Sequence, residues 1–410
     1  KIKINKCIFF LSKNSFEEII NFSEVALAGS FLKKKEIKSE KKYKLNFVVC
    51  KKCKHPQIGF YLNKDLLFKN YLWETGVSNH NINLINRLIV KLPKIKEINN
   101  NTNIIEIASN DGSLLKILND KFHCKVLGVD PALNLHKTSK EKNIDFISDY
   151  FSYLISKKIK FKYSKFDICI ARNVIAHLKD PNDIFKGVKN LLRKDGLFII
   201  EVPHLLNIFT DLQFDNVFHE HVGFHSLKSI EDLCINNNMY LYDAEKVDSQ
   251  GGSIRCYISN NNKNKSSNLI RYLKEEKKYK LFNLKSWKTF AFKVEENNNN
   301  LRNLLTKLKQ KNKIISVYGA SGKGQTLLQY LGLNHTFFSY IYDKSTIKQN
   351  LYSPGTHIRI VNPKNILQDM PDYILLCSWN LLKEIKKEQI NYFKRGGKFI
   401  VPFPRPKIIK

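Results

Sequence analysis

The chain has 410 residues, of which 43% are hydrophobic and 26% are charged. This composition is typical of a globular protein and excludes an intrinsically disordered chain, and the length predicts two or three domains. Lys and Arg number 69 against 37 Asp and Glu, which gives a net charge of +32 at pH 7. No apolar run reaches the roughly 20 residues that a membrane helix needs, so we expect no transmembrane span.

The positive charge has two interpretations. It could indicate a polyanionic partner such as nucleic acid. It could also reflect base-composition drift, because Lys is scattered and is accompanied by Asn runs at Asn99–Asn101 and Asn297–Asn300. We favour drift and expect no nucleic-acid partner. A phosphorylated metabolite is compatible with both interpretations.

Eight cysteines are present, and several lie inside apolar runs, as Cys169 and Cys377 do. This placement is typical of reduced, buried thiols and not of a disulfide framework. No signal-peptide pattern opens the chain. We therefore expect a cytoplasmic protein, with a monomer favoured.

Residues 1–62 are basic, with short apolar runs, and are predicted to form a small irregular lobe. Cys50 and Cys53 form a CxxC knuckle, which is half of a zinc site, and Cys7 is a third candidate ligand. A partner for Cys7 is expected three residues further on, where the chain has Phe10. His55 could donate instead, although it lies close to Cys53. The sequence therefore leaves open whether this lobe binds zinc or no metal.

Residues 63–97 are predicted to be a helical linker, with a helix around 81–91. From residue 104 the pattern becomes strand, turn and helix, which favours a parallel α/β sheet over residues 98–300. Its predicted strands are Ile104–Ala108, Lys125–Asp130, Asp145–Ser148, Asp167–Ala171, Leu197–Val202, Tyr240–Val247 and Ser253–Ile258. The last two strands are predicted to pair as an antiparallel hairpin.

Residues 260–312 are charged and are predicted to be a helical connector. A second, shorter α/β unit is predicted within residues 301–410. Its predicted strands are Ile314–Tyr318, Ser339–Asp343, Tyr373–Cys377 and Phe399–Pro402.

The segment Glu106–Gly112 carries the strongest local signal, because a strand ends there and a helix begins at Ser113. Such a turn presents free N–H groups to a carboxylate or phosphate. Asp130, at the end of the next strand, can accept hydrogen bonds from both ribose hydroxyls. A dinucleotide and S-adenosylmethionine (SAM) both fit this pattern, and a turn without a ligand is the alternative. The single glycine does not match the GxGxxG dinucleotide motif. Glu106, the predicted seven strands and the late antiparallel hairpin favour SAM. The cofactor-binding candidates are Glu106, Ala108, Asn110, Asp111, Gly112, Asp130, Asp149 and Asn173.

The segment Phe214–His225 contains three histidines and a carboxylate within seven residues. Acid–base chemistry is one interpretation, since a histidine titrates near neutral pH and a neighbouring Glu can tune it. A metal site made by His219, His221 and His225 and a purely structural role are the alternatives.

The segment Tyr318–Gly324 again lies between a strand and a helix. It is similar to a phosphate-binding turn in which Lys323 is the counter-charge. It is not a Walker A motif, because no Ser or Thr follows the lysine. Close packing alone would also explain its glycines.

These motifs occur in an order that resembles the sugar C-methyltransferases acting on nucleotide-linked 4-keto-deoxyhexoses. The similarity extends over nearly the whole chain. Further matching segments are Ala171–His177, Glu201–Pro203, Gly251–Arg255, Ser353–His357, Ser378–Asn380 and Gly397–Pro404. The resemblance implies a class I SAM-methyltransferase (Rossmann-like) sheet, an N-terminal zinc-binding lobe and a C-terminal Rossmann-like domain.

The resemblance also implies the reaction, which is methyl transfer from SAM to a carbon next to the sugar ketone. His221 matches the family base that removes the proton, and Glu220 matches its supporting carboxylate. The nucleotide sugar is expected between the last two domains. The implied substrate-binding candidates are Tyr71, Trp73, His177, Phe218 and Lys323.

The chain departs from the family pattern at four positions. Phe218 and Trp73 stand where tyrosines are usual, although Tyr71 lies two residues away, and Phe10 replaces a zinc ligand. Each lost phenol removes a candidate enolate stabiliser, worth about 3 kcal/mol. Ala108 lies where the family usually has a glycine, and we expect the alanine to be tolerated. Two other functions therefore stay open: an O-methyltransferase on another acceptor, and a degenerate protein that only binds the nucleotide sugar.

Overall fold

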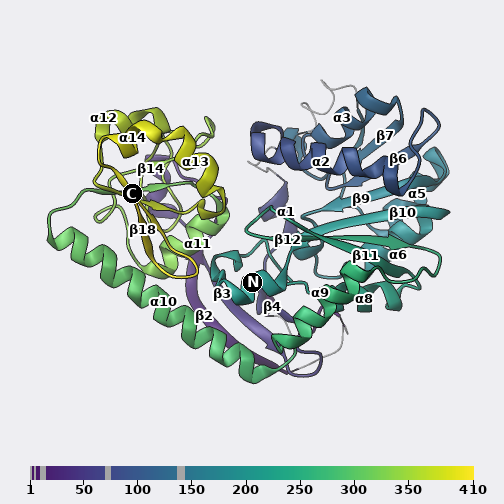
Figure 1. Cartoon of the computed structure of the whole chain (residues 1–410), viewed down its shortest axis with the longest axis horizontal. Coiled ribbons are helices and arrows are strands. Elements are labelled where there is room, and N and C mark those ends of the chain that lie inside the picture. The colour runs from purple at the N-terminus through teal and green to yellow at the C-terminus, as the bar shows by residue number, and fades with distance from the viewer. Residues whose placement is uncertain (1, 4–5, 10–14, 70–74, 136–143) are drawn as a thin grey trace.

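The computed structural model describes residues 2–3, 6–9, 15–69, 75–135 and 144–410. Two α/β units lie side by side in Figure 1, with the N-terminal strands and the long helix α10 (Leu284–Gln310) running between and beneath them. The helix confirms the connector predicted over residues 260–312. No helix in the described part of the chain is both long and apolar enough to cross a lipid bilayer.

The larger sheet has seven strands in the order β11-β12-β10-β9-β6-β7-β8. Their bounds are β6 Asn103–Ile107, β7 Lys125–Val129, β8 Asp145–Ile147, β9 Phe166–Arg172, β10 Leu192–Pro203, β11 Tyr240–Val247 and β12 Ser253–Ser259. The strands from β10 to β8 pair in parallel, whereas β12 is antiparallel to both of its neighbours. This is the class I SAM-methyltransferase sheet, so the predicted fold is confirmed, hairpin included.

Alternate residues of the central strands face two separate cores. Ile168 and Ile170 of β9 belong to one core, and Cys169 and Ala171 belong to the other. Strands that are buried on both faces require such continuous apolar runs. The surrounding helices are α2 Asn79–Ile95, α3 Ser113–Phe122, α5 Tyr153–Tyr163, α6 Pro181–Leu191, α8 Leu227–Asn236 and α9 Ser267–Lys278.

The C-terminal sheet has six strands in the order β15-β14-β13-β16-β17-β18. Their bounds are β13 Ile315–Tyr318, β14 Ile341–Tyr342, β15 Ile360–Val361, β16 Tyr373–Leu376, β17 Lys398–Val401 and β18 Lys407–Ile409. The sequence predicted four of them. It missed β15, which has only two residues, and β18, which adds to the edge antiparallel to β17. The helices are α11 Gly322–Leu331, α12 Ile366–Asp369, α13 Leu382–Glu388 and α14 Ile390–Lys394.

The N-terminal lobe is a sheet and not the irregular segment that the sequence predicted. Strands β2 (Phe16–Ala26), β3 (Lys42–Cys50) and β4 (Pro56–Ile58) form an antiparallel sheet, and β1 (Ile2–Lys3) pairs with β5 (Phe60–Tyr61). The register of β2 shifts twice, and Ser23 has a φ of 61°. These irregularities break the two-residue alternation that identifies a strand in a sequence. The short helix α1 (Lys64–Phe68) follows the lobe.

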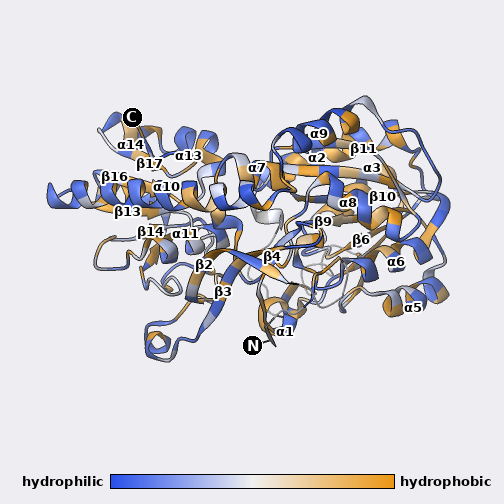
Figure 2. Cartoon of the chain, turned by 90° about the horizontal axis from the view of Figure 1, so that it is seen from below, coloured by the Kyte–Doolittle hydropathy of each residue, from blue (hydrophilic) through white to orange (hydrophobic). Residues whose placement is uncertain are grey.

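One hydrophobic core joins the lobe to the rest of the molecule. Phe47 of β3 contacts Trp287 of α10 with ring centroids 5.5 Å apart, and the core continues into α7 (Leu205–Thr210) and the C-terminal sheet. Figure 2 shows hydrophobic residues concentrated in the strands, with hydrophilic residues along outer helices such as α10. The segment 205–224 is therefore packed among three parts of the chain.

Candidate functional site

The turn after β6 has the geometry that a ligand-binding turn requires. Ala108, Asn110 and Gly112 have φ values of 55°, 53° and 72°, in the left-handed region. Asp130, at the end of β7, accepts the N–H of Asn110 at 2.9 Å and that of Ala132 at 2.9 Å. Gly112 is the N-cap of α3 and makes no side-chain cap hydrogen bond. Asp111, one residue before the N-cap, accepts the N–H of Ser113 at 3.2 Å, so a side chain of the turn already binds the first amide of α3.

Ala108 occupies a position where glycine would be less strained. A side chain in the left-handed region costs about 1 kcal/mol because Cβ approaches the following carbonyl. This backbone conformation explains why a glycine is usual here. The expected tolerance of the alanine stays a prediction.

Glu106 is buried in β6 and pairs with a neighbouring strand. Its Oε1 accepts from Arg172 Nε at 3.0 Å and Nη2 at 2.7 Å, while Oε2 has no hydrogen-bond partner among the described residues. Burial raises the pKa of Glu106 to about 7, and the guanidinium opposes that shift. An unpartnered buried carboxylate oxygen beside this turn fits a ligand that carries a cationic amine, as SAM does.

Asn110 and Asp111 bind the chain itself. Asn110 Oδ1 accepts from Thr75 N at 2.8 Å and from Thr75 Oγ1 at 3.1 Å, and Asp111 Oδ2 accepts from Gly76 N at 3.0 Å. Both side chains thus hold residues 75–77 against the turn. Sequence reasoning missed Thr75 and Gly76, because nothing in their local pattern indicates a contact 35 residues away.

Two further SAM candidates lie at the ends of neighbouring strands. Asp149 follows β8, and its Oδ1 accepts the N–H of Tyr150 at 2.7 Å. Asn173 follows β9 with a φ of 53°, and its Oδ1 is buried without a hydrogen-bond partner among the described residues. The turn after β6, Asp130, Asp149 and Asn173 therefore share the carboxyl edge of the sheet, where α/β folds bind ligands.

His221 lies next to this edge with its tautomer fixed. Its Nδ1 bonds to the carbonyl oxygen of Asn216 at 2.8 Å. A carbonyl only accepts, so Nδ1 carries the proton and Nε2 keeps a lone pair. Burial, followed by electrostatic repulsion from His177, holds the pKa of His221 well below its usual range. The imidazole is therefore a neutral base at neutral pH.

His177 is brought beside His221 by backbone pairing. The carbonyl of Ala176 accepts the N–H groups of Val222 at 2.7 Å and Gly223 at 3.0 Å. The two imidazole centroids consequently lie 5.0 Å apart. Burial lowers the pKa of His177 to about 4, so both rings are uncharged near neutral pH.

Glu220 does not hold the Nδ1 atom of His221. Its half-buried carboxylate faces the N-terminal lobe, where Oε1 lies 3.4 Å from the position that a Cβ on Gly29 would take. The hydrogen bond from Nδ1 goes to the carbonyl oxygen of Asn216 instead. Support of the base by Glu220 stays a prediction, and it cannot act through that nitrogen in this arrangement.

The three histidines of the motif diverge. His219 Nε2 bonds to the carbonyl of Lys44 at 3.2 Å, and His225 packs on His55 with centroids 5.2 Å apart. Within the described ranges, the one group of three or more metal-ligand side chains lies elsewhere. The metal alternative for this motif is therefore wrong.

One buried carboxylate fixes both ends of the segment that carries His221. Glu276 of α9 bonds to His204 Nε2 at 2.7 Å and accepts the N–H groups of Leu227 at 2.6 Å and Lys228 at 3.2 Å. His204 begins this segment and Leu227 begins α8. Sequence reasoning missed Glu276, which lies in a charged helix with no motif around it.

Phe218 and Lys323 connect His221 to the C-terminal unit. The ring of Phe218 packs against His221 at a tilt of 36° with centroids 4.1 Å apart, and it lies 3.3 Å from the position of a Cβ on Gly322. Lys323 is buried, and its Nζ donates to the carbonyl of Gln250. The lysine therefore turns toward the β11–β12 hairpin. Its predicted pairing with a substrate phosphate would require this contact to change.

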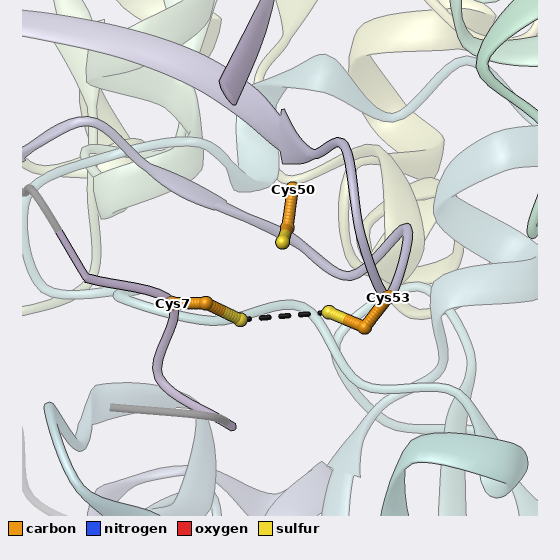
Figure 3. Close-up of side chains that lie close together, drawn as sticks. All are labelled: Cys7, Cys50 and Cys53. Atoms are coloured by element: carbon orange, nitrogen blue, oxygen red, sulfur yellow. Dashed lines mark hydrogen bonds between the residues drawn. The ribbon is translucent and has the colours of Figure 1, made fainter. Parts of the chain in front are cut away.

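The thiols of Cys7, Cys50 and Cys53 converge in the lobe, as Figure 3 shows. The three sulfur atoms lie within 4.8 Å of one another, and the Sγ atoms of Cys7 and Cys53 are 3.5 Å apart. Hydrogen bonds from the other two thiols hold the pKa of Cys50 well below its usual range. Three converging thiols suit Zn²⁺, which takes four ligands.

His55 is not part of the thiol group. Its Nε2 lies 3.2 Å from the position of a Cβ on Gly223, on the side of His225. Phe10, Tyr71 and Trp73 lie outside the described residues. The three cysteines thus converge as the sequence predicted, whereas the fourth ligand stays open.

The knuckle is tied to the segment that follows His221. The N–H of Ile58 donates to Val222 O at 3.0 Å, and the N–H of Phe224 donates to Pro56 O at 3.1 Å. Strand β4 begins three residues after Cys53. The lobe therefore supports the backbone next to the candidate base.

Three family models match consecutive parts of the chain. They are described as "Putative zinc binding domain" over residues 11–68, "Methyltransferase domain" over 78–243 and "C-methyltransferase C-terminal domain" over 248–404. Together they follow the lobe, the seven-stranded sheet and the C-terminal unit in order.

The chain is also similar to C-methyltransferase NovU of Streptomyces niveus. The two are 28% identical over 395 residues, which cover 96% of this chain and 94% of that protein. Among solved structures, the PH0226 protein from Pyrococcus horikoshii OT3 matches 49% of this chain and 99% of its own, at 18% identity and a TM-score of 0.38. A SAM-bound magnesium protoporphyrin IX methyltransferase from Synechocystis PCC 6803 matches 44% and 79%, at 11% identity and a TM-score of 0.34.

The likeness to NovU spans both chains almost completely, and the family models name a methyltransferase domain and a C-methyltransferase domain. These matches agree with the strand order of the larger sheet and with the left-handed turn after β6. The chain therefore has the domain organisation of a SAM-dependent C-methyltransferase.

Proposed function

We propose that the chain methylates a carbon next to the ketone of a nucleotide-linked 4-keto-deoxysugar. The C-methyltransferase relationship supports carbon as the methyl acceptor. A proton next to a ketone is a weak acid, so the reaction needs a positioned base and a stabiliser for the enolate oxygen. The 4-keto sugar is the acceptor that the family resemblance implies.

The tautomer of His221 is the observation that carries this proposal. Asn216 holds Nδ1 at 2.8 Å, and the ring is kept neutral by burial. Nε2 is therefore available to accept a proton. A base anchored in this way loses little entropy when it meets the acceptor carbon.

The surroundings of His221 fit an acceptor held between two units of the chain. Asn173 and His177 approach from the carboxyl edge of the larger sheet, and Phe218 reaches Gly322 of α11. SAM, when bound, supplies an electrophilic methyl. The chain's own part is to orient the acceptor carbon, exclude water and take up the proton at His221.

A structural zinc held by Cys7, Cys50 and Cys53 is part of the proposal. The donor set fits zinc, and the pairing of β4 with residues 222–224 gives the metal a way to stabilise the backbone beside His221. We further propose a cytoplasmic protein whose partner is the nucleotide sugar.

A mass-spectrometric acceptor screen tests the proposal. TDP-, CDP- and GDP-linked 4-keto-6-deoxyhexoses are incubated with the purified chain and SAM. The expected product carries one added methyl, and NMR places it on a carbon next to the ketone.

Other outcomes of the screen would contradict the proposal. A methyl found on oxygen would make the chain an O-methyltransferase. Tight binding of a nucleotide sugar together with SAM, without any turnover, would make it a binding protein instead.

A further inference from the structure

The carbonyl group that fixes the tautomer of His221 belongs to a buried turn. Asn216 ends the short 3₁₀-helix Phe214–Asn216, and its carbonyl oxygen lies 2.8 Å from His221 Nδ1. The Asn216 side chain is fully buried, and its Nδ2 donates to Gln213 Oε1 at 3.1 Å and to Gln213 O at 3.4 Å. The N–H of Asn216 donates to the same Gln213 carbonyl at 3.1 Å. The residue that holds the candidate base is therefore itself held by Gln213.

Gln213 is in turn attached to the β11–β12 hairpin. Only 1% of Gln213 is exposed, and its Nε2 donates to the carbonyl of Gly251 at 2.7 Å and to Asp211 Oδ2 at 3.2 Å. Gly251 lies at the tip of the hairpin, between the end of β11 and the start of β12. The amide of Gln213 thus uses its nitrogen for the hairpin and its oxygen for Asn216. The hydrogen bonds therefore continue from the hairpin through Gln213 and Asn216 to His221.

The C-terminal unit also contacts this turn. Trp379 Nε1 donates to Asp215 Oδ2 at 2.8 Å. A Cβ on Gly251 would lie 2.5 Å from Trp379 Cη2 and 3.0 Å from Gln213 Oε1. Gly251 thus fits between the tryptophan and the glutamine only because it has no side chain. The turn that carries the Asn216 carbonyl is therefore held by both of the units between which the acceptor is proposed to bind.

The position of this carbonyl decides which nitrogen of His221 can act as a base. A neutral imidazole carries its single proton on either nitrogen, and the hydrogen bond that one nitrogen makes selects the tautomer. If the Asn216 carbonyl moves away, the proton can go to Nε2, and that nitrogen then loses the lone pair that removes a proton from the acceptor. Close packing alone would hold the segment together, but it does not distinguish the two tautomers.

We propose that Gln213 and Asn216 are positioning residues for His221. Together they keep the Asn216 carbonyl on Nδ1, which leaves Nε2 free to accept the proton from the carbon next to the ketone. This inference rests on the proposed function. Neither side chain has to touch the acceptor, because both act through the backbone carbonyl.

NMR of the ¹⁵N-histidine-labelled chain reads the tautomer directly and needs no acceptor. The signals of His221 are identified by their absence in His221→Ala. In the wild type, Nδ1 should carry the proton and Nε2 should not. Gln213→Met keeps the length of the side chain and removes its amide, so His221 should populate both tautomers in this variant. A wild-type tautomer of His221 in Gln213→Met would overturn the inference.

Solvent deuterium exchange at the carbon next to the ketone measures the consequence for the reaction. The assay uses the same panel of TDP-, CDP- and GDP-linked 4-keto-6-deoxyhexoses in the absence of SAM. Gln213→Met and Asn216→Ala should each exchange about 10–100-fold more slowly than the wild type, as for lost partners that orient a metal-bound histidine. SAM affinity should be unchanged, because neither side chain bonds to the turn after β6.

The double variant tests whether the two residues act as one unit. Side chains in one hydrogen-bond network have non-additive effects. Gln213→Met combined with Asn216→Ala should therefore exchange no more slowly than the slower single variant. Losses that multiply in the double variant would contradict a shared route to His221.

Gln329 is the matched control. Its Oε1 accepts the N–H of Ala26 at 2.8 Å, and its Nε2 donates to the carbonyl of Ala26 at 3.3 Å. It thus joins two parts of the chain through both ends of its amide, as Gln213 does, but it does so away from His221. Gln329→Met should keep the wild-type exchange rate and the wild-type tautomer. Equal losses in Gln329→Met and Gln213→Met would contradict a special role for Gln213.

Each outcome decides a different statement. A wild type that exchanges no member of the panel defeats the proposed function, and the inference with it. If the wild type exchanges and Gln213→Met keeps pace, the function stands and the inference alone fails. If Gln213→Met does not fold, Asn216→Ala decides by the same two measurements, and a fixed tautomer with wild-type exchange overturns the inference.

Discussion

The two glycine-containing turns of the chain are built alike and used differently. In both, a carboxylate at the end of the second strand braces the turn after the first: Asp130 accepts the N–H of Asn110 at 2.9 Å, and Asp343 accepts that of Ala320 at 2.6 Å. Each carboxylate also accepts the N–H two residues further on. The shared brace belongs to the α/β fold and does not by itself indicate a ligand.

The difference lies in the helix that follows each turn. At the start of α3 the N-cap Gly112 has no side chain and Asp111 accepts the N–H of Ser113 at 3.2 Å, whereas the N-cap Ser321 of α11 accepts the N–H of Gly324 at 3.1 Å. The second turn is also tightly packed, because a Cβ on Gly319 would lie 2.0 Å from Ser378 Oγ. Its glycines are thus explained by close packing, which was the alternative to a phosphate site. The first turn is the one that suits a ligand, because the buried Oε2 of Glu106 beside it has no hydrogen-bond partner among the described residues.

The largest expected effect is a loss of stability when a side chain is added to the second turn. Gly319→Ala should destabilise the chain by about 4 kcal/mol, because the added methyl overlaps Ser378 and the φ of 98° disfavours a side chain. Gly396 is the control, since its φ is 90° with no atom within 4 Å of a Cβ. Gly396→Ala should cost only about 1 kcal/mol. Equal losses in denaturant unfolding would show that packing does not explain Gly319.

The second largest expected effect is on the pH dependence of stability, through the buried carboxylate of Glu106 just before the first turn. Glu106 has a pKa of about 7 in the folded chain against 4.5 for the free group, so the folded state holds an extra proton between these values. Its contribution to the unfolding free energy is present below pH 4.5 and is lost as pH rises through 7, by up to about 3 kcal/mol. Glu106→Gln should therefore gain stability relative to the wild type from pH 4 to pH 8. Parallel pH curves for the two proteins would refute this.

The third prediction compares Asp130 and Asp343, the aspartates that brace the first and the second turn. Asp130→Asn should weaken SAM binding by about 2 kcal/mol, as for hydrogen bonds to a lost charge, whereas Asp343→Asn should leave SAM affinity unchanged. Titration calorimetry measures both. A change of the same size in both variants would mean that the second turn also serves SAM, and no change in either would remove Asp130 from the site.

The thiol cluster is connected to the segment that carries His221 and not to the turn after β6. The connection is strand β4, which pairs with residues 222–224. Metal analysis of the wild type should give one zinc per chain or none, since three thiols hold zinc more weakly than four. Where zinc is present, Cys50→Ser should lose it, reduce methyl transfer several-fold and keep SAM affinity. Zinc retained by Cys50→Ser would contradict the assignment.

The smallest expected effect is the loss of stability when Ser321, the N-cap of α11, is removed. Ser321→Ala should cost about 1 kcal/mol of stability, as for other lost N-caps, without changing SAM affinity. Thermal unfolding and calorimetry check the two parts separately. Weaker SAM binding in Ser321→Ala would show that the turns are not independent.

The sequence predicted the regular parts of the fold well. All seven strands of the larger sheet are found. Central parallel strands such as β9 and β10 are continuous buried apolar runs, and the antiparallel pair β11–β12 was predicted as a hairpin. The N-terminal sheet could not be predicted in the same way, since the bulges around Ser23 interrupt its alternation. The two-residue strand β15 is too short to carry any pattern.

The candidate site could be predicted only where a motif is contiguous. Cys50, Cys53 and the strand-end residues came from local spacing, whereas Cys7 was a candidate by residue type alone, and the structure brings each set together. The carbonyl of Asn216 on His221, Glu276 at both ends of the segment, and the carbonyl of Gln250 on Lys323 depend on tertiary contacts. Such contacts join residues far apart in the chain, or act through backbone atoms, so no pattern in the sequence marks them.

The most direct test of the central claim is solvent deuterium exchange by His221→Ala at the carbon next to the ketone. If Nε2 of His221 takes the proton, this variant should lose exchange and methyl transfer together, by about 10²–10⁴-fold, while SAM affinity stays at the wild-type value. Exchange by His221→Ala at the wild-type rate would contradict the account.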